Sequence, residues 1–269
     1  MTSKLKLLCV LAHPDDESLG TGGILARYAA EGVETYLVTA TRGERGWFGD
    51  ESEYPGAKAL GKIREAELLA AAAVLGLHRV EFLDYPDGEL DQARPAEVIA
   101  KIVGHLRRVM PDVVVTFGPD GAYGHPDHIA VSQLTAAALV AAADPTAHYC
   151  RELPTHRVAK FYYLVATHES AGVYQSVFGR LVMFIDGVER DEVAWPDWAI
   201  TTRIETWDYW RTVWQAVCCH RTQLPAFQSL EQVSEEQHRI LWNSQTYYRA
   251  FSLVNRGRKV EHDLFEGLR

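Results

Sequence analysis

The chain has 269 residues, of which 47% are hydrophobic and 23% are charged, a composition typical of a globular protein with a substantial core. Its 27 Lys and Arg against 36 Asp and Glu give a formal net charge of −9, which argues against nucleic acid or an anionic membrane as the main partner. No apolar run reaches the roughly 20 residues of a membrane-spanning helix, and four cysteines are too few for a disulfide scaffold. We therefore expect a cytoplasmic protein with reduced thiols and no integral membrane segment.

Strands and helices alternate through the first half of the sequence. Residues 4–12 form a short apolar run, typical of a strand buried on both faces, and glycines then lead to a helix expected over residues 24–30. The further elements expected in this half are strands over residues 33–39, 80–83 and 113–117 and helices over residues 58–75, 95–109 and 129–142. This alternation predicts βαβ units, and hence a Rossmann-like, doubly wound α/β fold with a mostly parallel sheet.

The second half of the sequence has a different pattern. The elements expected there are strands over residues 161–166, 181–185 and 201–205 and a helix over residues 209–220. Neither a repeat nor a low-complexity linker separates the two halves. We therefore expect one domain over residues 1–269, in which a Rossmann-like core over residues 1–166 continues into a C-terminal α+β elaboration over residues 167–269.

Clusters of histidine and carboxylate follow two of the predicted strands. Residues 13–17, directly after the first strand, read HPDDE, and residues 125–128, in the loop after the fourth strand, read HPDH. In open α/β sheets, ligands bind at the carboxyl ends of the strands, where the strand order reverses. With the strand order 3-2-1-4, the first and fourth strands are neighbours at that reversal. The two clusters are then expected to face each other across one crevice.

The two clusters contain the ligand types of a catalytic zinc site. Such a site uses three protein ligands and leaves a fourth position for water. His13, Asp16 and His128 would supply two imidazoles and one carboxylate, and so hold one ion per chain, either zinc or another divalent metal. A helix cap would explain either Asp15 or Asp16, but it would not explain two such clusters on facing strand ends.

Three more residues of these clusters suit hydrolysis. Asp15 is adjacent to a predicted ligand and would take a proton from the metal-bound water, whose pKa the ion lowers from about 15.7 towards 7. His125, three residues before His128, would stay off the metal. Asp127 would fix the tautomer of His125 and keep it protonated, ready to stabilise an oxyanion or to donate to a leaving amine. The clusters thus predict a site with a nucleophile generator, a base and an acid.

The two motifs resemble those of the LmbE-like, or PIG-L, family of zinc-dependent N-deacetylases. Residues 12–17 (AHPDDE) match the first family motif, and residues 125–128 match the second. Further similarity covers most of the chain, at residues 41–44 (TRGE), 64–65 (RE), 87–88 (DG) and 219–223 (CHRTQ). The last of these resembles the late His-x-Ser-Gln element of the family, with Thr in place of Ser. The resemblance implies the roles already given to the residues of the two motifs.

The resemblance also implies roles for three residues outside the predicted metal ligands His13, Asp16 and His128, here called the metal set. Tyr123 stands where some members that act on inositol-linked amino sugars carry a tyrosine that helps to hold the substrate carbonyl. Arg42 corresponds to the family arginine that meets the sugar, and His220 would close the pocket from the C-terminal half. Alternatives stay open, because Tyr123 can pack on its own turn and Arg42 can pair with Glu44 or Glu65.

The activity that the resemblance implies is hydrolysis of the acetamide of an N-acetylglucosamine-type amino sugar to a free amine and acetate. The alternatives are an amidase of a related thiol-sugar conjugate and a sugar-binding module that keeps the metal site without hydrolysis. The partner expected is a small N-acetyl amino sugar, and a homo-oligomer stays open. Residues 43–56, rich in glycine and acidic residues, are expected to form either a mobile lid or an ordinary surface loop.

Two rival classes of enzyme fit the sequence less well. A nucleotide-binding dehydrogenase needs G-x-G-x-x-G, but the glycines stand at 20, 22 and 23, and the second strand leads to Arg42 rather than to an acid for the ribose. A non-haem iron oxygenase also uses two histidines and one carboxylate. Turnover without oxygen would distinguish the hydrolase from the oxygenase.

Overall fold

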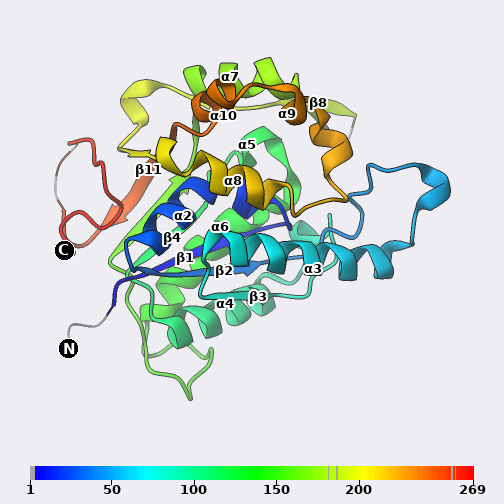
Figure 1. Ribbon diagram of the computed structural model, residues 1–269. Coiled ribbons are helices and arrows are strands. Elements are labelled where there is room, and N and C mark those ends of the chain that lie inside the picture. The colour runs from blue at the N-terminus through cyan, green and yellow to red at the C-terminus, as the bar shows by residue number, and fades with distance from the viewer. Residues whose placement is uncertain (1–3, 181, 186, 256, 258) are drawn as a thin grey trace.

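The centre of the molecule is one large sheet (Figure 1). The computed structural model describes residues 4–180, 182–185, 187–255, 257 and 259–269. In these residues, seven strands pair in the order β10-β11-β5-β4-β1-β2-β3. The parallel strands are β1 (Lys6–Leu11), β2 (Glu34–Thr39), β3 (Arg79–Phe82), β4 (Val113–Phe117) and β5 (Lys160–Leu164). The predicted α/β fold with a mostly parallel sheet is confirmed.

The predicted strand order 3-2-1-4 is also confirmed. β1 lies between β2 and β4, with Leu7 opposite Thr35 on one side and opposite Val113 on the other. Nearly every residue of β1 and β4 is buried, as expected of apolar strands that are covered on both faces. The segments that follow β1 and β4 therefore start side by side at the same edge of the sheet.

Four helices of the first half lie close to their predicted bounds: α2 (Gly22–Ala30), α3 (Ala57–Leu75), α4 (Pro95–Val109) and α6 (Pro126–Ala143). The short helices α1 (Asp16–Leu19) and α5 (Gly121–Gly124) were not predicted. Pro95 occupies the first turn of α4, and Gly76 ends α3 in the left-handed conformation, with φ of 76°. α2 and α3 pack with the later helix α8, whereas α4 packs with α6, so helices cover both faces of the sheet (Figure 1).

The second half adds two strands to the sheet and a cap of helices above it (Figure 1). β11 pairs antiparallel with both β5 and β10. The elements are β6 (Ala166–Thr167), α7 (His168–Phe178), β7 (Val182–Ile185), β8 (Val188–Asp191), β9 (Ala194–Trp195), β10 (Thr202–Glu205), α8 (Trp210–Val217), α9 (Gln228–Gln232), α10 (Glu235–Leu241) and β11 (Ser244–Ser252). The expectation of a single domain over residues 1–269 stays a prediction.

One expectation for this half is met and one needs correction. The strand expected over residues 181–185 is β7, which pairs with β8 in a hairpin apart from the main sheet; Leu181 lies outside the described residues. The helix expected over residues 209–220 ends at Val217, and the chain then turns so that His220 is completely buried. This difference comes from long-range packing, which the local pattern of the sequence does not contain.

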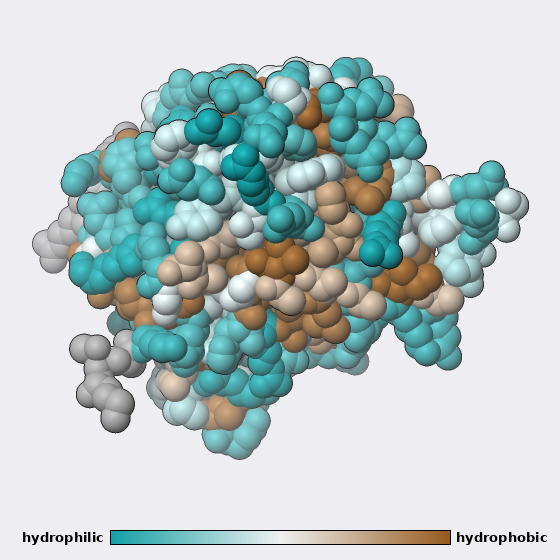
Figure 2. All heavy atoms as spheres, in the orientation of Figure 1, coloured by the Kyte–Doolittle hydropathy of each residue, from teal (hydrophilic) through white to brown (hydrophobic). Residues whose placement is uncertain are grey.

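The surface mixes polar side chains with an apolar band. Figure 2 shows apolar residues across the middle of one face, and α3 in this region carries the exposed Ile63 and Leu69. None of the described helices is long and apolar enough to cross a membrane. Cys9, Cys150, Cys218 and Cys219 are all free thiols in the structure.

Candidate active site

The three predicted metal ligands meet where the segments after β1 and β4 lie side by side. His13 Nδ1 is 3.2 Å from His128 Nε2. Asp16 Oδ2 is 3.7 Å from His13 Nδ1, and Asp16 Oδ1 is 3.6 Å from His128 Nε2. Tetrahedral bonds of about 2.0–2.2 Å to a zinc ion would separate the donor atoms by about 3.3–3.6 Å. The residues present therefore fit a divalent ion with two nitrogen ligands and one oxygen ligand.

Neighbouring groups orient both ligands of the first motif. Asp16 Oδ2 accepts the backbone N–H groups of His13, at 2.8 Å, and Ala12, at 3.1 Å. His13 Nε2 lies 3.2 Å from both Asp127 Oδ2 and Asp87 Oδ1, so its proton points at carboxylates and Nδ1 faces the other ligands. Burial opposes the charged form, but these two carboxylates raise the pKa of His13 to about 10. A metal at Nδ1 would displace a proton.

Asp127 occupies a different place from the one expected. Its buried carboxylate lies on His13 and accepts the backbone N–H groups of Gly88, at 2.8 Å, and Leu90, at 3.0 Å. The expected contact between the side chains of Asp127 and His125 is wrong. The reason is that Asp127 begins α6 with its side chain turned towards the loop after β3, which the spacing in the sequence does not indicate.

His125 caps the N-terminus of α6. Its Nδ1 accepts the backbone N–H of Asp127 at 3.2 Å, so in the neutral ring the proton sits on Nε2. Burial and the nearby charge of His13 lower the pKa of His125 to about 4. The expectation of a protonated His125 is therefore not met, although a neutral ring with Nε2–H still donates a hydrogen bond.

His125 is nevertheless close enough to be considered as a ligand. Nitrogen atoms of His13, His125 and His128 all lie within 4.8 Å of one another, and their rings are 4.6–5.2 Å apart. A nitrogen that binds a metal needs a free lone pair. The lone pair of His125 Nδ1 already accepts the backbone N–H of Asp127, and in the neutral ring Nε2 carries the proton. The carboxylate of Asp16, which is held in place by two backbone N–H groups, offers another candidate for the third donor.

Asp15 is held in a strained backbone conformation beside the metal set. Its φ of 116° is rare for a residue with a side chain. Arg64, which is almost completely buried, donates to Asp15 Oδ2 at 3.1 Å and to the carbonyl of Pro14, and Glu17 Oε2 accepts the N–H of Asp15 at 2.9 Å. The carboxylate is thereby fixed at the wall of the cavity described below. Sequence reasoning gave Arg64 and Glu17 no role of their own.

His220 lies behind this loop rather than at the pocket. It is completely buried, and its Nε2 lies 2.7 Å from Oε1 of Glu17, which in turn holds Asp15. It does not line the cavity. The expectation that His220 closes the pocket is therefore wrong; it supports Glu17 instead. Its neighbour in the late element, Gln223, does line the cavity and donates to the carbonyl of Gly46 at 2.9 Å.

Arg42 does not reach the site. It donates to Glu65 at 2.5 Å and to Asp84, and its guanidinium lies 4.5 Å from the centre of the Phe82 ring. The pairing with Glu65 is one of the alternatives left open above. Arg42 is not among the residues that line the cavity, so the structure does not bring it to the predicted sugar.

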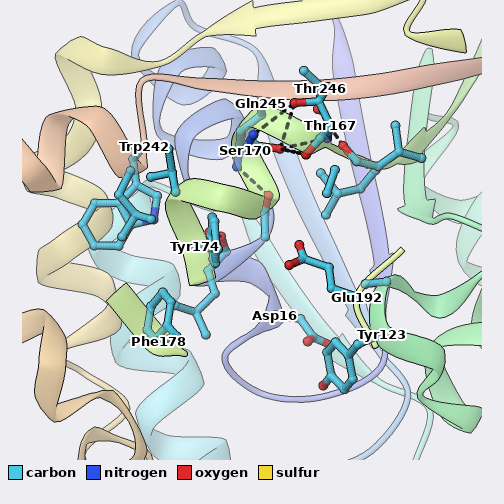
Figure 3. Close-up of a pocket in the computed structure, with 18 of the residues that line it drawn as sticks. Asp16, Tyr123, Thr167, Ser170, Tyr174, Phe178, Glu192, Trp242, Gln245 and Thr246 are labelled. Carbon is cyan, nitrogen blue, oxygen red and sulfur yellow. Dashed lines mark hydrogen bonds between the residues drawn. The ribbon is translucent and has the colours of Figure 1, made fainter. Parts of the chain in front are cut away.

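A cavity of about 560 Å³ opens above the metal set. Asp15, Asp16, Tyr123 and His128 line one end of it, and the Tyr123 ring centre is 5.4 Å from that of His128. Figure 3 shows Tyr123 beside Asp16, with Glu192 next to them. Phe48, from the segment expected to be either a lid or a surface loop, also lines the cavity, but its movement stays a prediction.

The fold and the site together define the class of protein. Two imidazoles and a carboxylate fit a metal at the carboxyl ends of a parallel sheet, and a fixed aspartate and a third histidine lie beside them. This is the arrangement of a metal-dependent hydrolase.

Comparison with known proteins supplies the family. Residues 8–139 match the family described as PIG-L: GlcNAc-PI de-N-acetylase. A 1D-myo-inositol 2-acetamido-2-deoxy-alpha-D-glucopyranoside deacetylase of Rhodococcus jostii is 37% identical, over 82% of this chain and 82% of the relative. A protein of the same name from Streptomyces avermitilis is 34% identical, over 98% and 97%. The chain belongs to the PIG-L family of LmbE-like N-deacetylases, and it is a hydrolase that acts on an amide bond.

Solved structures agree on the fold. The conserved protein TT1542 from Thermus thermophilus has a TM-score of 0.66 and 26% identity, and the match covers 94% of this chain and 97% of that one. An N,N'-diacetylchitobiose deacetylase from Pyrococcus horikoshii has a TM-score of 0.69 at 22% identity, over 91% and 83%. At that identity the second comparison supports the architecture alone.

Proposed function

We propose that this protein hydrolyses the acetamide of an N-acetylglucosamine-type amino sugar, using one zinc ion per chain held by His13, Asp16 and His128. The observation that carries the proposal is the approach of these three side chains: the two ring nitrogens are 3.2 Å apart, and each lies 3.6–3.7 Å from one of the two carboxylate oxygens of Asp16. The relatives in Rhodococcus and Streptomyces, which are named as deacetylases of an inositol-linked acetamido sugar, support the choice of substrate.

A divalent ion at this site would polarise the acetyl carbonyl and lower the pKa of a water molecule. Asp15 removes the proton of the attacking water, and Arg64 keeps that carboxylate in place. The Nε2–H of His125 donates to the oxygen that becomes negative, and the hydroxyl of Tyr123 faces the same end of the cavity. Asp15 then returns its proton to the nitrogen as the C–N bond breaks, which yields acetate and a free amine.

The carboxylates behind His13 have a defined part in this mechanism. Asp127 and Asp87 hold the Nε2–H of His13, so that the lone pair of Nδ1 would be available to hold the ion. Among the alternatives, a binding module without hydrolysis needs no base, yet Arg64 and Glu17 both fix Asp15 at the cavity. This supports an enzyme over a binding module.

The test is acetate release from a panel of N-acetylated amino sugars, including inositol-linked N-acetylglucosamine. Protein with measured zinc content is compared with chelator-treated protein and with chelated protein to which zinc is returned. We expect acetate release that is lost on chelation and restored by zinc. Failure of every N-acetyl amino sugar with zinc-loaded protein would contradict the proposal.

The ligand set has a test of its own. We expect Asp16→Asn to lower zinc content, because it removes a ligand, whereas His125→Ala keeps zinc and loses turnover by about 10²–10³, the effect of removing one oxyanion donor. Zinc analysis of the two purified variants distinguishes the set His13, Asp16 and His128 from the set His13, His125 and His128. Loss of zinc from His125→Ala with retention by Asp16→Asn would favour the three-histidine set instead.

A cytoplasmic location is part of the proposal. It is supported by the free thiols of all four cysteines, which suit a reducing compartment. Labelling of these cysteines with a thiol reagent in freshly lysed cells, with and without prior reduction, tests it. Equal labelling is expected.

A further inference from the structure

The cavity extends well beyond the metal set into an apolar chamber. Its far side is built by α7, α10 and the segment between α8 and α9. Tyr174, Phe178 and Phe227, here called the aromatic wall, all line it. The ring centres of Tyr174 and Phe178 are 5.4 Å apart, and those of Phe178 and Phe227 are 5.9 Å apart. Figure 3 shows Tyr174 and Phe178 on the side of the cavity away from Tyr123.

The aromatic wall is firmly supported and offers no free polar group. Its rings pack against a buried cluster that includes Leu230 and Trp242. The hydroxyl of Tyr174 donates to the carbonyl of Leu19 at 2.8 Å, so its polar atom is already engaged. A ligand at the aromatic wall therefore meets ring faces and edges, which suit an apolar group rather than a polyol.

Glu192 lines the same cavity and lies beside Asp16 and Tyr123 (Figure 3). Its Oε2 is buried and has no hydrogen-bond partner among the residues that the structure describes, and burial raises the pKa of its carboxyl. Two other charged residues of the lining have partners within the protein: Asp120 accepts Trp195 Nε1 at 2.8 Å, and Arg180 bonds to Asp191. The side chain as a whole is half-buried, but a buried carboxylate oxygen without a partner is costly, so its position points to a donor supplied by a ligand.

The size of the chamber fits a second group beside the sugar. The volume of about 560 Å³ lies within the range of about 300–1,000 Å³ that is typical of small-molecule sites. Tyr123 and Glu192 lie beside the metal-set residue Asp16, and Tyr174 and Phe178 line another part of the same cavity (Figure 3). A sugar whose acetamide is at the metal set would therefore have room for a substituent on the side of the aromatic wall.

We propose that the substrate is an N-acetylglucosaminide with an apolar aglycone, alkyl or aryl, which packs on the aromatic wall, while Glu192 accepts hydrogen bonds from hydroxyls of the sugar. This inference rests on the proposed function, because the acetamide at the metal set positions the rest of the molecule. It differs in aglycone from the inositol in the names of the relatives.

The test is a series of methyl, butyl and octyl N-acetylglucosaminides, in both anomers, with acetate release measured by zinc-loaded enzyme. Each fully buried methylene is expected to raise kcat/KM about fourfold. A rise of about tenfold or more from methyl to octyl in either anomer supports the proposal. A smaller rise overturns it, even if the methyl glycoside is hydrolysed. If no glycoside is hydrolysed, it is the proposed function that fails.

Variants of Phe178 and Glu192 test the contributions of the aromatic wall and of Glu192 to kcat/KM separately. Phe178→Ala is expected to flatten the rise of kcat/KM with chain length, whereas Phe178→Leu keeps an apolar lining and keeps the rise. Phe184→Ala is the matched control, since Phe184 is 70% exposed and does not line the cavity. Glu192→Gln is expected to lower kcat/KM about tenfold for every member of the series alike. An unchanged slope in Phe178→Ala, or an unaffected Glu192→Gln, would contradict the corresponding part of the proposal.

Discussion

Two clusters of buried charge lie at opposite ends of the same parallel sheet. At the amino end, Lys160 starts β5 opposite Val113, and its Nζ donates to Glu261 at 2.8 Å and to the carbonyl of Glu266 at 2.9 Å. Glu261 also accepts the hydroxyl of Tyr162 at 2.7 Å and pairs with Arg249. At the carboxyl end lies the metal set with its surrounding carboxylates and Arg64.

The two clusters differ in how completely they are paired. Both carboxylate oxygens of Glu261 and the ammonium of Lys160 have partners within the protein. At the carboxyl end, His128 Nδ1, Glu44 Oε2 and Arg64 Nε are buried with no partner in the described part of the chain. An unpaired buried group costs roughly 1–3 kcal/mol, so the cluster at the carboxyl end is less well arranged for stability than the cluster at the amino end.

The largest expected effect is on turnover at the carboxyl end. Asp15→Asn removes the base and is expected to lower kcat by about 10²–10⁴ without changing the free energy of unfolding by a comparable amount. Acetate release and urea denaturation of the same preparation check this. Asp208→Asn, an exposed aspartate, is the matched control and should leave both unchanged. A kcat for Asp15→Asn within tenfold of the wild type would remove Asp15 from the chemistry.

The opposite result is expected at the amino end. Glu261→Gln leaves Lys160 and Arg249 without their counter-charge and is expected to lower the free energy of unfolding by about 3–5 kcal/mol, with kcat of the folded enzyme unchanged. Urea denaturation at pH 7 measures it, and the exposed Glu205→Gln serves as control. If Glu261→Gln lowered kcat instead of stability, the contrast between the two clusters would be wrong.

This contribution of Glu261 also depends on pH. Burial opposes ionisation, but the bonds from Lys160 and Tyr162 lower its pKa below the ordinary value of 4.5. The stabilisation is therefore complete well above pH 4.5 and is lost as the pH falls through the lowered pKa of the folded state. The difference in stability between wild type and Glu261→Gln should shrink in acid.

A smaller effect is expected behind the metal set. Asp127→Asn weakens the group that orients His13 and is expected to lower metal affinity about 10–100-fold. Competition with a chelator of known affinity measures it. If Asp127→Asn kept its metal affinity but lost turnover, Asp127 would instead orient His125, as the sequence suggested.

The smallest effect is expected for Arg42. Its ion pairs with Glu65 and Asp84 are partly exposed, and such pairs contribute at most about 1 kcal/mol. Arg42→Ala should keep KM and kcat within about twofold of the wild type. A tenfold rise in KM for the sugar would show that Arg42 meets the substrate after all.

The sequence determined the architecture and the meeting of the two His/Asp motifs, because both follow from short-range rules. Apolar runs alternating with helices imply parallel strands, and the carboxyl ends of parallel strands share one edge of the sheet. The sequence therefore predicted that His13, Asp16 and His128 lie close together, although 112 to 115 residues separate the two motifs.

The tertiary structure alone decided which partner each remaining side chain takes. Asp127 turned to His13, Arg42 to Glu65, and His220 to Glu17, because each contact depends on the packing of loops and helix ends that are distant in sequence. The aromatic wall and Glu192 were likewise beyond the sequence, since they belong to segments after residue 167 that carry no motif. Hydrophobic periodicity and strand order specify the path of the backbone. The contacts of a side chain depend on which other residues the folded structure places next to it.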